Sequence, residues 1–452
     1  MQRTLLFKIL IILGITVLIA VALGMIQSTI SDRAQFRDDA VKSVSSESVR
    51  EQTITGPILV VPYTDDYVEV IPAKSSSEPA ETIRRSVARK HLVFPNQLDI
   101  NGKIETYRRY RGIHQVLMYG GAHTIKGDFV LPTLNELPRA ASDSKLTLGP
   151  AYLALGIEDV RGIADFPKVN WNGGAIEFQQ GSGMQALRGG LHAKLPSMEL
   201  GAKATFAFAL KLNGIERQHV VPVGKNNTIT MASNWPHPQF GGDFLPAPDR
   251  TIDENGFNAT WTIASLATNA QQQLRDIELD GEAGKPRNVD AFNVAFIEPV
   301  NVYSMAERAT KYGLLFVALT FAAFFMFEVL KLLPIHPVQY LLVGLALVLF
   351  FLLLVSLSEH IAFLAAYLIA SAACIVLIGY YLAAVLRDWK RGMGFGTALT
   401  LLYGALYGLL VSENNALVLG SILLFAVLSG VMVATRKVDW YQIGKAGVAD
   451  AA

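Results

Sequence analysis

Hydrophobic residues are concentrated at the two ends of the chain. An apolar run from Ile9 to Ile26 follows Arg3 and Lys8. Five further apolar runs, each close to the roughly 20 residues that a helix needs to cross a bilayer, cover 312–333, 338–357, 361–386, 395–411 and 416–434. The pattern therefore predicts an N-terminal transmembrane helix and a C-terminal bundle of five transmembrane helices, whose short connections make neighbouring helices antiparallel.

The first apolar run has two interpretations, an uncleaved anchor or a signal peptide cleaved after "AVA" at 20–22. Its core of about 18 residues is longer than the 7–15 residues typical of a signal peptide. No polar spacer precedes the cleavage motif. We therefore expect an uncleaved anchor, and under both interpretations the next segment leaves the cytoplasm.

The middle of the chain has a different pattern, with no stretch that could span a membrane between Ser28 and about Ala309. Residues 31–52 have helical composition and predict a stalk helix. Short β-branched and aromatic runs follow, beginning with "TITGPILVVPYT" at 53–64, and clusters of Gly, Pro, Asn and Asp separate them. This spacing predicts a mainly-β domain of one or two sandwiches, with a long hairpin loop at 74–85.

The predicted organisation is an anchor (1–27), a β-rich domain (28–310), a five-helix transmembrane bundle (311–435) and a tail (436–452). Basic residues lie in the loops on one side of the bundle, and the opposite short loops carry Glu359 and Glu413 without Lys or Arg. By the positive-inside rule, both termini are cytoplasmic and residues 28–310 are periplasmic. The basic residues on the cytoplasmic side are Lys331, Arg387, Lys390, Arg391, Arg436, Lys437 and Lys445.

Composition narrows the class of partner. Only 17% of residues are charged, against about 25% in soluble proteins, so the lipid bilayer is one partner. A net charge of +1 gives no support for nucleic-acid binding. The single cysteine, Cys374, lies in an apolar run, where a free Cys acts as a small packing residue. No pattern in the sequence sets the oligomeric state.

Several long strings resemble the CreD inner-membrane proteins of Gram-negative bacteria, in the same order along the chain. These strings are "GPILVVPY" (56–63), "RRYRGI" (108–113), "DVRGI" (159–163), "SNWPHPQFGGDFLPA" (233–247), "ERATKYGLLFVALTFAAFFMFE" (307–328), "HPVQYLLVGLALVLFFLLLVSLSEH" (336–360) and "VDWY" (438–441). The resemblance implies an inner-membrane protein with a large periplasmic domain. It also implies roles in the β-lactam response, colicin tolerance and envelope integrity under a two-component system. It supplies no enzymatic activity and no catalytic residue.

The segment "ASNWPHPQFGGDFLPA" (232–247), called the elbow below, raises a question of chemistry. Prolines fix their own φ angles, and the Gly pair allows a tight turn, so a rigid structural corner is expected. A docking loop is the second interpretation. Catalysis through a pair of His237 and Asp243 is the third and weakest, because no nucleophile is identifiable by spacing. The candidate residues are Asn234, Trp235, Pro236, His237, Pro238, Phe240 and Asp243.

The sequence gives little indication of a metal site or of a serine nucleophile. The histidines of the middle region form no HExxH pair or other close ligand spacing, so we expect no metal or cofactor. "SDSK" (142–145) matches the Ser-x-x-Lys pattern of penicillin-interacting enzymes, but the companion SDN and KTG motifs are absent from the sequence. A solvated loop is the expected structure there.

Two other groups are candidates for binding or transport. Arg108, Arg109 and Arg111 lie in a strand-like stretch that is expected to be either a solvated basic face or a contact for an anionic head group or glycan. In the bundle, Glu328 is expected to pair with Lys331 at an interface, and Glu359 with His360 is expected to cap a span.

The sequence favours a non-enzymatic envelope-stress protein whose periplasmic domain binds an envelope component or partner protein. A transporter or lipid-handling protein is the alternative, and it would need a polar path through the bundle. A cell-wall hydrolase is a second alternative, and it would need a pocket that joins His237 to a carboxylate and a Ser.

Overall fold

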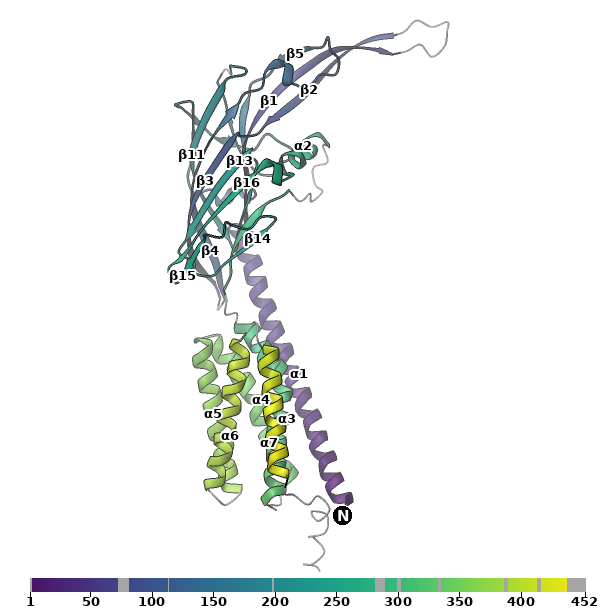
Figure 1. The fold of residues 1–452 in the computed structure, drawn as a ribbon, viewed down its shortest axis with the longest axis vertical. Helices are drawn as coiled ribbons and strands as arrows, with labels where there is room; N and C mark the ends of the chain where they lie inside the picture. Colours follow the sequence, from purple (N-terminus) through teal and green to yellow (C-terminus); the bar gives the residue numbers. More distant parts are fainter. Residues whose placement is uncertain are drawn as a thin grey trace, which may run out of the picture. The chain divides into compact units, whose positions relative to one another are not determined.

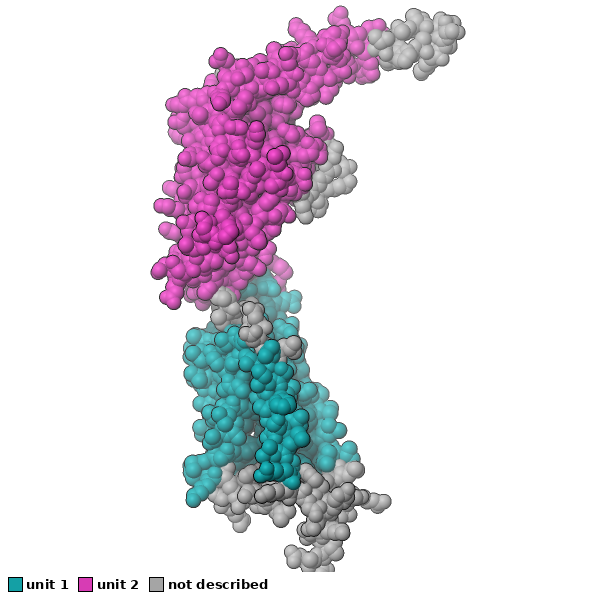
Figure 2. Space-filling model, viewed as in Figure 1, with its two compact units in different colours: residues 1–38, 300–452 teal, residues 39–299 magenta. Residues whose placement is uncertain are grey.

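A computed structural model describes residues 2–71, 81–112, 114–196, 199–280, 289–298, 302–331, 335–385, 389–412 and 416–436. It divides into two compact units, residues 1–38 with 300–452 and residues 39–299, which Figure 2 shows in different colours. The first unit is helical and the second is mainly β (Figure 1). The predicted arrangement of an N-terminal apolar helix, a β-rich middle and apolar C-terminal helices is therefore confirmed.

Helix α1 (Gln2–Glu47) is one continuous helix of 46 residues, about 69 Å long at 1.5 Å per residue. The predicted anchor and most of the predicted stalk are thus parts of one helix, and the boundary between the two units falls within it. The C-terminal helices are α3 (Val302–Lys331), α4 (Pro337–Ser358), α5 (Phe363–Val385), α6 (Trp389–Val411) and α7 (Ala416–Thr435).

Five helices of the described part are long and apolar enough to cross a membrane, namely α1, α3, α4, α5 and α6. In α7 the apolar stretch Val418–Val433 is shorter. Glu413 and residues 437–452 of the predicted tail lie outside the described residues.

Helix α1 packs into the helical unit through one face. Ile19, Leu23, Ile26 and Ile30, spaced as neighbours along one side of a helix, are buried in the hydrophobic core of this unit. A Cβ atom added at Gly344 of α4 would lie 2.9 Å from Ile19 Cγ1, and one added at Gly313 of α3 would lie 3.2 Å from Leu23 Cδ2. Small residues at these points let the helices approach closely, so α1 is a member of the bundle core.

The β-rich unit contains two sheets. Sheet A has the order β14-β17-β12-β1-β6-β10-β9, with β2 and β5 paired to β1, and sheet B has the order β15-β16-β13-β3-β4-β11-β7-β8. In sheet A the strands are β1 (Gln52–Ile71), β2 (Glu81–Val93), β5 (Lys145–Leu148), β6 (Tyr152–Ile157), β9 (Gln179–Gln180), β10 (Gly190–Lys194), β12 (Arg217–Val221), β14 (Pro238–Gly242) and β17 (Phe292–Phe296). In sheet B they are β3 (Gln97–Arg111), β4 (His114–Val130), β7 (Lys168–Trp171), β8 (Gly174–Glu177), β11 (Lys203–Ile215), β13 (Asn226–Ser233), β15 (Thr251–Asp253) and β16 (Gly256–Ala264).

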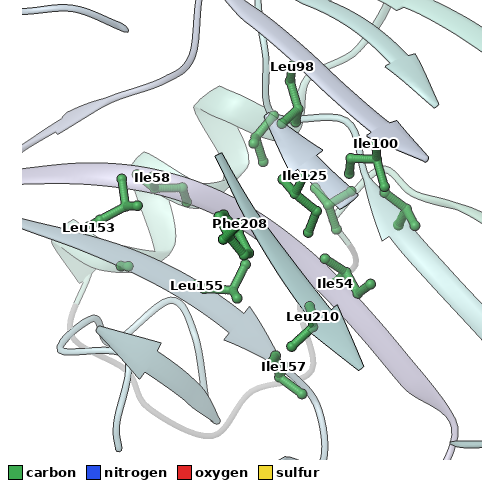
Figure 3. Close-up of a cluster of buried hydrophobic side chains, with 14 of the residues drawn as sticks. Ile54, Ile58, Leu98, Ile100, Ile125, Leu153, Leu155, Ile157, Phe208 and Leu210 are labelled. Carbon is green, nitrogen blue, oxygen red and sulfur yellow. The ribbon is translucent and has the colours of Figure 1, made fainter. Parts of the chain in front are cut away.

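The two sheets share one hydrophobic core. Alternate residues of β11 are buried and exposed, as a strand with one face on the core requires. Ile54 and Leu155 of sheet A lie in the same cluster as Ile100 and Phe208 of sheet B (Figure 3). This arrangement agrees with the predicted sandwich. Helix α2 (Ala270–Asp280) belongs to the same unit.

A contact between a histidine and a glutamine joins the two sheets across this core. His123 of β4 is buried, and its Nε2 lies 3.0 Å from Nε2 of Gln218 on β12. A Cβ at Gly102 or Gly121 would lie 2.7 or 2.5 Å from a ring nitrogen of His123, so both positions need glycine to make room for the imidazole. Burial lowers the pKa of His123 to about 4, because desolvation disfavours the charged ring.

Strands β1 and β2 form a hairpin whose far part extends beyond the rest of the β-rich unit as an arm (Figure 1). They pair antiparallel from Leu59 with Val93 to Ile71 with Glu81. The predicted hairpin loop was 74–85, but residues 81–85 belong to β2 because they continue the antiparallel pairing with β1. Residues 72–80 lie outside the described part of the chain.

Candidate functional site

The elbow is a strand followed by a turn, and most of its polar groups have structural partners. The side-chain oxygen of Asn234 accepts hydrogen bonds from the backbone N–H of Thr106 at 3.0 Å and from its hydroxyl at 3.2 Å. The indole N–H of Trp235 points to the carbonyl oxygens of His237 and Ile297, both at 3.1 Å. These contacts fasten the entry of the elbow to β3 and to the end of β17.

Strand β14 places the aromatic side chain of the elbow on the core. Phe240 lies between Phe257 and Trp261, with ring centroids 5.6 Å from each. Pro238 opens this strand, which is the terminal strand of the sheet A path. Proline suits such an edge because it has no N–H to donate to a further strand.

Gly242 and Asp243 close the elbow against β17. Gly242 has a φ of +86°, and a Cβ there would lie 2.3 Å from the carbonyl oxygen of Ala291. The carboxylate of Asp243 accepts from the N–H of Ala291 at 3.0 Å, and its own N–H donates to the Ala291 carbonyl at 2.9 Å. Glycine is therefore required at 242 by both backbone conformation and space.

The described contacts do not join His237 to Asp243. The ring of His237 is exposed and meets the edge of Trp235 at a centroid distance of 6.2 Å. Asp243 instead bonds to Ala291. Geometry thus gives the elbow the role of a rigid corner, and it separates the two residues of the hypothetical catalytic pair.

A cleft of 1030 Å³ lies beside the elbow, within the β-rich unit. Its lining includes Asp243 but not His237. Strands β1, β6, β12, β14 and β17 of sheet A contribute one wall, and α2 and residues 184–189 contribute others. Ligand sites in proteins commonly have volumes of roughly 300–1,000 Å³, so the cleft is large enough for a small ligand.

A row of polar residues crosses the sheet in this cleft. Thr53 of β1 stands opposite His219 of β12, and His219 stands opposite Asn293 of β17. The row continues to Glu158, whose N–H lies 3.3 Å from the Thr53 carbonyl, and at the other end to Gly241, opposite Asn293. Because Thr53, Glu158, His219 and Asn293 all line the cavity, they present hydroxyl, carboxylate, imidazole and amide groups side by side.

The carboxylates of the cleft are not equivalent. Asp290 caps the start of α2, accepting from the Asn269 N–H at 2.8 Å, the Thr268 hydroxyl at 3.1 Å and the Gln273 amide at 2.7 Å. The Asn269 N–H contributes most to holding the pKa of Asp290 below its usual value. Asp243 and Glu158 are exposed in the cleft. Only one oxygen of Asp243 accepts from the Ala291 N–H, so both carboxylates can still meet a ligand.

The predicted basic stretch bonds mainly to the chain itself. Arg111 makes two hydrogen bonds, 2.8 and 2.9 Å, to the carboxylate of Glu47 in the last turn of α1. Arg109 reaches the Ser48 hydroxyl at 3.3 Å, and Arg108 bonds to Glu298 at 3.2 Å. The positions expected to contact an anion thus already have partners in the protein.

A further arginine, from another part of the chain, bonds to the same end of α1. Arg161, in the short 3-10 helix η2 (Val160–Gly162), donates to the carbonyls of Ser46 at 2.7 Å and Ser45 at 3.3 Å. Asp159 accepts from Arg161 at 2.6 Å. This hydrogen bond is the main reason why the pKa of Asp159 is lowered.

A cation at a helix C-terminus satisfies the last carbonyls and the helix dipole. We call Arg109, Arg111, Asp159 and Arg161 the α1 clamp. Sequence reasoning did not find Asp159 and Arg161 as functional candidates. "DVRGI" marked the segment, but their partners lie more than 100 positions away.

Two polar clusters of the helical unit involve α1, one at Lys8 and one at Arg33. Glu328 of α3 bonds to Lys8 of α1 and accepts from the Tyr340 hydroxyl of α4 at 2.9 Å. The expected partner Lys331 has a side chain outside the described part. Glu328 therefore links the three helices α1, α3 and α4.

Glu359 forms the second cluster, at the C-terminal cap of α4. It accepts from the Tyr303 hydroxyl at 3.2 Å and lies 3.8 Å from Arg33 of α1. His360 has an exposed side chain, and its backbone N–H bonds to Leu357. Glu359 is thus a cap, as expected, and also holds α1.

Other chemistry has little geometric support in the described residues. They contain no group of three or more His, Cys, Asp or Glu side chains that could hold a metal ion. Ser142, the serine of the Ser-x-x-Lys pattern in "SDSK", lies in a turn before β5, and not at the helix start that such a nucleophile needs.

Comparison with known proteins identifies the family. The family model described as "Inner membrane protein CreD" matches residues 4–441. The curated inner membrane protein CreD of Escherichia coli (strain K12) is 36% identical over 442 residues, covering 98% of this chain and 95% of that protein. The chain belongs to the CreD family.

Solved structures add no argument to the CreD assignment. An M1 zinc metallopeptidase from Deinococcus radiodurans has 9% identity and a TM-score of 0.20, covering 45% of this chain and 42% of its own. Native leukotriene A4 hydrolase from Saccharomyces cerevisiae has 10% identity and a TM-score of 0.22, covering 45% of this chain and 29% of its own. Scores this low establish neither a shared fold nor a shared activity for the CreD chain.

Proposed function

We propose that this CreD-family chain is a non-enzymatic inner-membrane protein that maintains envelope integrity in the β-lactam response. Its β-rich domain, residues 28–310, lies in the periplasm and binds an envelope component or a partner protein. Helix α1 and five C-terminal helices cross the membrane, with both termini in the cytoplasm. The distribution of Lys and Arg among the short loops supports this orientation.

The observation that carries the proposal is the α1 clamp. Arg161 holds the last carbonyls of α1, and Arg111 holds Glu47, so the β-rich unit grips the end of a membrane-spanning helix. Strand β1, which begins at Gln52 directly after the clamp, lines the cleft through Thr53 and Thr55. Occupancy of the cleft would therefore act on the strand that follows α1.

The non-enzymatic assignment is supported by how the elbow uses its polar groups. Asp243 bonds to a backbone amide, and His237 lies outside the cleft lining. A hydrolase would need a nucleophile and a base within hydrogen-bond reach, and the described contacts of the elbow do not join His237 to Asp243.

A transporter is less well supported. Coupled transport usually needs ionisable groups inside the bundle. Within the described side chains, Glu328 is paired with Lys8 and Glu359 lies 3.8 Å from Arg33. Aromatic rings fill the core between helices, for example Phe350 of α4 against Tyr403 of α6 at 4.7 Å.

The test is complementation of a strain that lacks its own copy. An Arg111→Ala/Arg161→Ala variant is compared with wild type at equal membrane abundance, scoring survival in β-lactam and detergent. Lys168→Ala is the matched control, because it removes an exposed ion pair with Glu177 that has no contact with α1. We expect loss of rescue by the clamp variant and full rescue by the control. Full rescue by the clamp variant would refute the proposal that the β-rich unit acts through the end of α1.

A further inference from the structure

The cleft beside the elbow has a chemistry that selects among ligands. Its exposed carboxylates are Glu158 and Asp243, and its exposed fixed cation is Arg188. Asp290 is engaged at the α2 cap, and His219 lies 3.5 Å from Glu51. The free groups of the cleft are therefore mainly acceptors with an excess of negative charge, which favours a donor-rich, positively charged ligand.

Part of the cleft lining is apolar. Leu274 and Ile277 of α2 line the cleft, together with Met184, Leu187 and Val289. Leu187 approaches the sheet closely enough that a Cβ at Gly156 would lie 2.8 Å from its Cδ2. A ligand seated here meets both hydrogen-bonding groups and hydrocarbon.

The ligand class follows from combining these features. We propose that the cleft binds a short extended peptide that carries a basic or free amino group. The hydroxyl of Thr53 and the amide of Asn293 suit the alternating donors and acceptors of a peptide backbone. The apolar wall accommodates side chains, and Asp243 and Glu158 receive the ammonium group.

Two other ligand classes fit less well. An anionic head group or phosphate would meet two exposed carboxylates, and the arginines of β3 that suit it are bonded elsewhere. A glycan is usually stacked on an aromatic ring, and the lining of this cleft includes no Phe, Tyr or Trp among the described residues.

The inference rests on the proposed function, because it names the ligand of the proposed periplasmic binding domain. The experiment measures binding to the purified full-length chain in detergent. The probes are two pools of tetrapeptides, blocked at both termini and identical except for Lys or Glu at one fixed position. We expect the Lys pool to bind and the Glu pool not to bind.

Two variants test whether the peptide binds in the cleft. Asp243→Asn keeps an oxygen for the Ala291 N–H, and Glu158→Gln keeps the shape of the side chain. Each should weaken binding of the Lys pool about tenfold, as expected for loss of a charged hydrogen-bond partner. Glu254→Gln, in the exposed turn between β15 and β16, is the control and should bind like wild type.

Equal binding of the two pools, or full affinity in both cleft variants, would overturn the inference. If Asp243→Asn does not fold, Glu158→Gln alone decides. Loss of rescue by the clamp variant, with no binding of the Lys pool, would reject the ligand class and leave the proposed function standing. Binding of the Lys pool with full rescue by the clamp variant would support the ligand class and reject the proposed function.

Discussion

Arg111 meets Glu47 through two hydrogen bonds of 2.8 and 2.9 Å, which join the end of β3 to the last turn of α1. Both side chains are about half exposed, at 51% and 56%. Exposed ion pairs contribute about 0.2–1 kcal/mol to stability. The value of this pair therefore lies in fixing the position of a helix end, which makes function a more sensitive readout than folding.

A charge exchange tests this pair. Arg111→Glu should reduce rescue of the deletion strain at normal abundance, because it places two carboxylates together. Glu47→Arg/Arg111→Glu should restore rescue, since the pair is rebuilt and a cation in the last turn of a helix is favourable. Survival in β-lactam, with membrane abundance measured in parallel, decides. A double variant no better than the single would show that the pair does not act as a unit.

The two glycines of the elbow should respond differently to substitution. Gly242→Ala should destabilise the β-rich unit by about 1–3 kcal/mol, because a side chain there is strained and meets the Ala291 carbonyl. Gly241→Ala should cost less, since its Cβ would lie 3.2 Å from the movable amide of Asn293. Thermal unfolding followed by tryptophan fluorescence checks the order, and equal losses would contradict it.

His123 predicts a loss of stability in acid. Its pKa is about 4 in the folded chain, against about 6.5 when unfolded. The unfolded state therefore binds the proton first. The stability from the neutral ring is fully present above pH 6.5 and declines as the pH falls towards 4, by about 3 kcal/mol in total.

The test for His123 compares unfolding at pH 7.5 and pH 4.5. His123→Gln keeps a hydrogen-bonding group for Gln218 and removes the titration, so it should lose less stability in acid than wild type. His192→Gln is the control, because this histidine is only partly buried and bonds to the Gly181 carbonyl. Equal acid sensitivity of wild type and His123→Gln would show that another group governs the response.

The cluster of Lys8, Glu328 and Tyr340 predicts non-additive effects. Glu328→Gln leaves the charge of Lys8 without its partner and should destabilise the helical unit by about 1–3 kcal/mol. Lys8→Gln/Glu328→Gln removes both charges and keeps an acceptor for the Tyr340 hydroxyl, so it should recover most of the loss. The melting temperature in detergent measures both. Additive losses would mean that the charges do not interact.

The local sequence pattern was sufficient to predict the helices and strands of this chain, but not which residues they contact. The apolar runs gave α4 and α5 within a few residues, because a membrane helix is encoded by a contiguous stretch. The sequence predicted α1 as two segments, an anchor and a stalk, because the hydropathy falls after Ile26. The helix itself continues to Glu47. The residues from Met25 to Glu47 include no Pro or Gly to interrupt it.

Partners distant in sequence were beyond such reasoning. The corner formed by Pro236 and Pro238 was predictable from backbone restrictions alone. Its attachment to Ala291 was not, because β17 lies about fifty residues further on and pairs through backbone groups. Arg111 was visible as a cation, but only the fold brings Glu47 to it. The same reason kept Glu158, His219 and Asn293 from being recognised as one row.

The proline at the start of β14 also limits what the β-rich unit can do with its neighbours. An open sheet edge is a template on which a second chain can add a strand, and such pairing leads to aggregation. Pro238 removes one amide donor from this edge, and the turn at Gly242 ends the strand after five residues. This edge of the sheet is therefore a poor template for strand addition by a second copy of the chain.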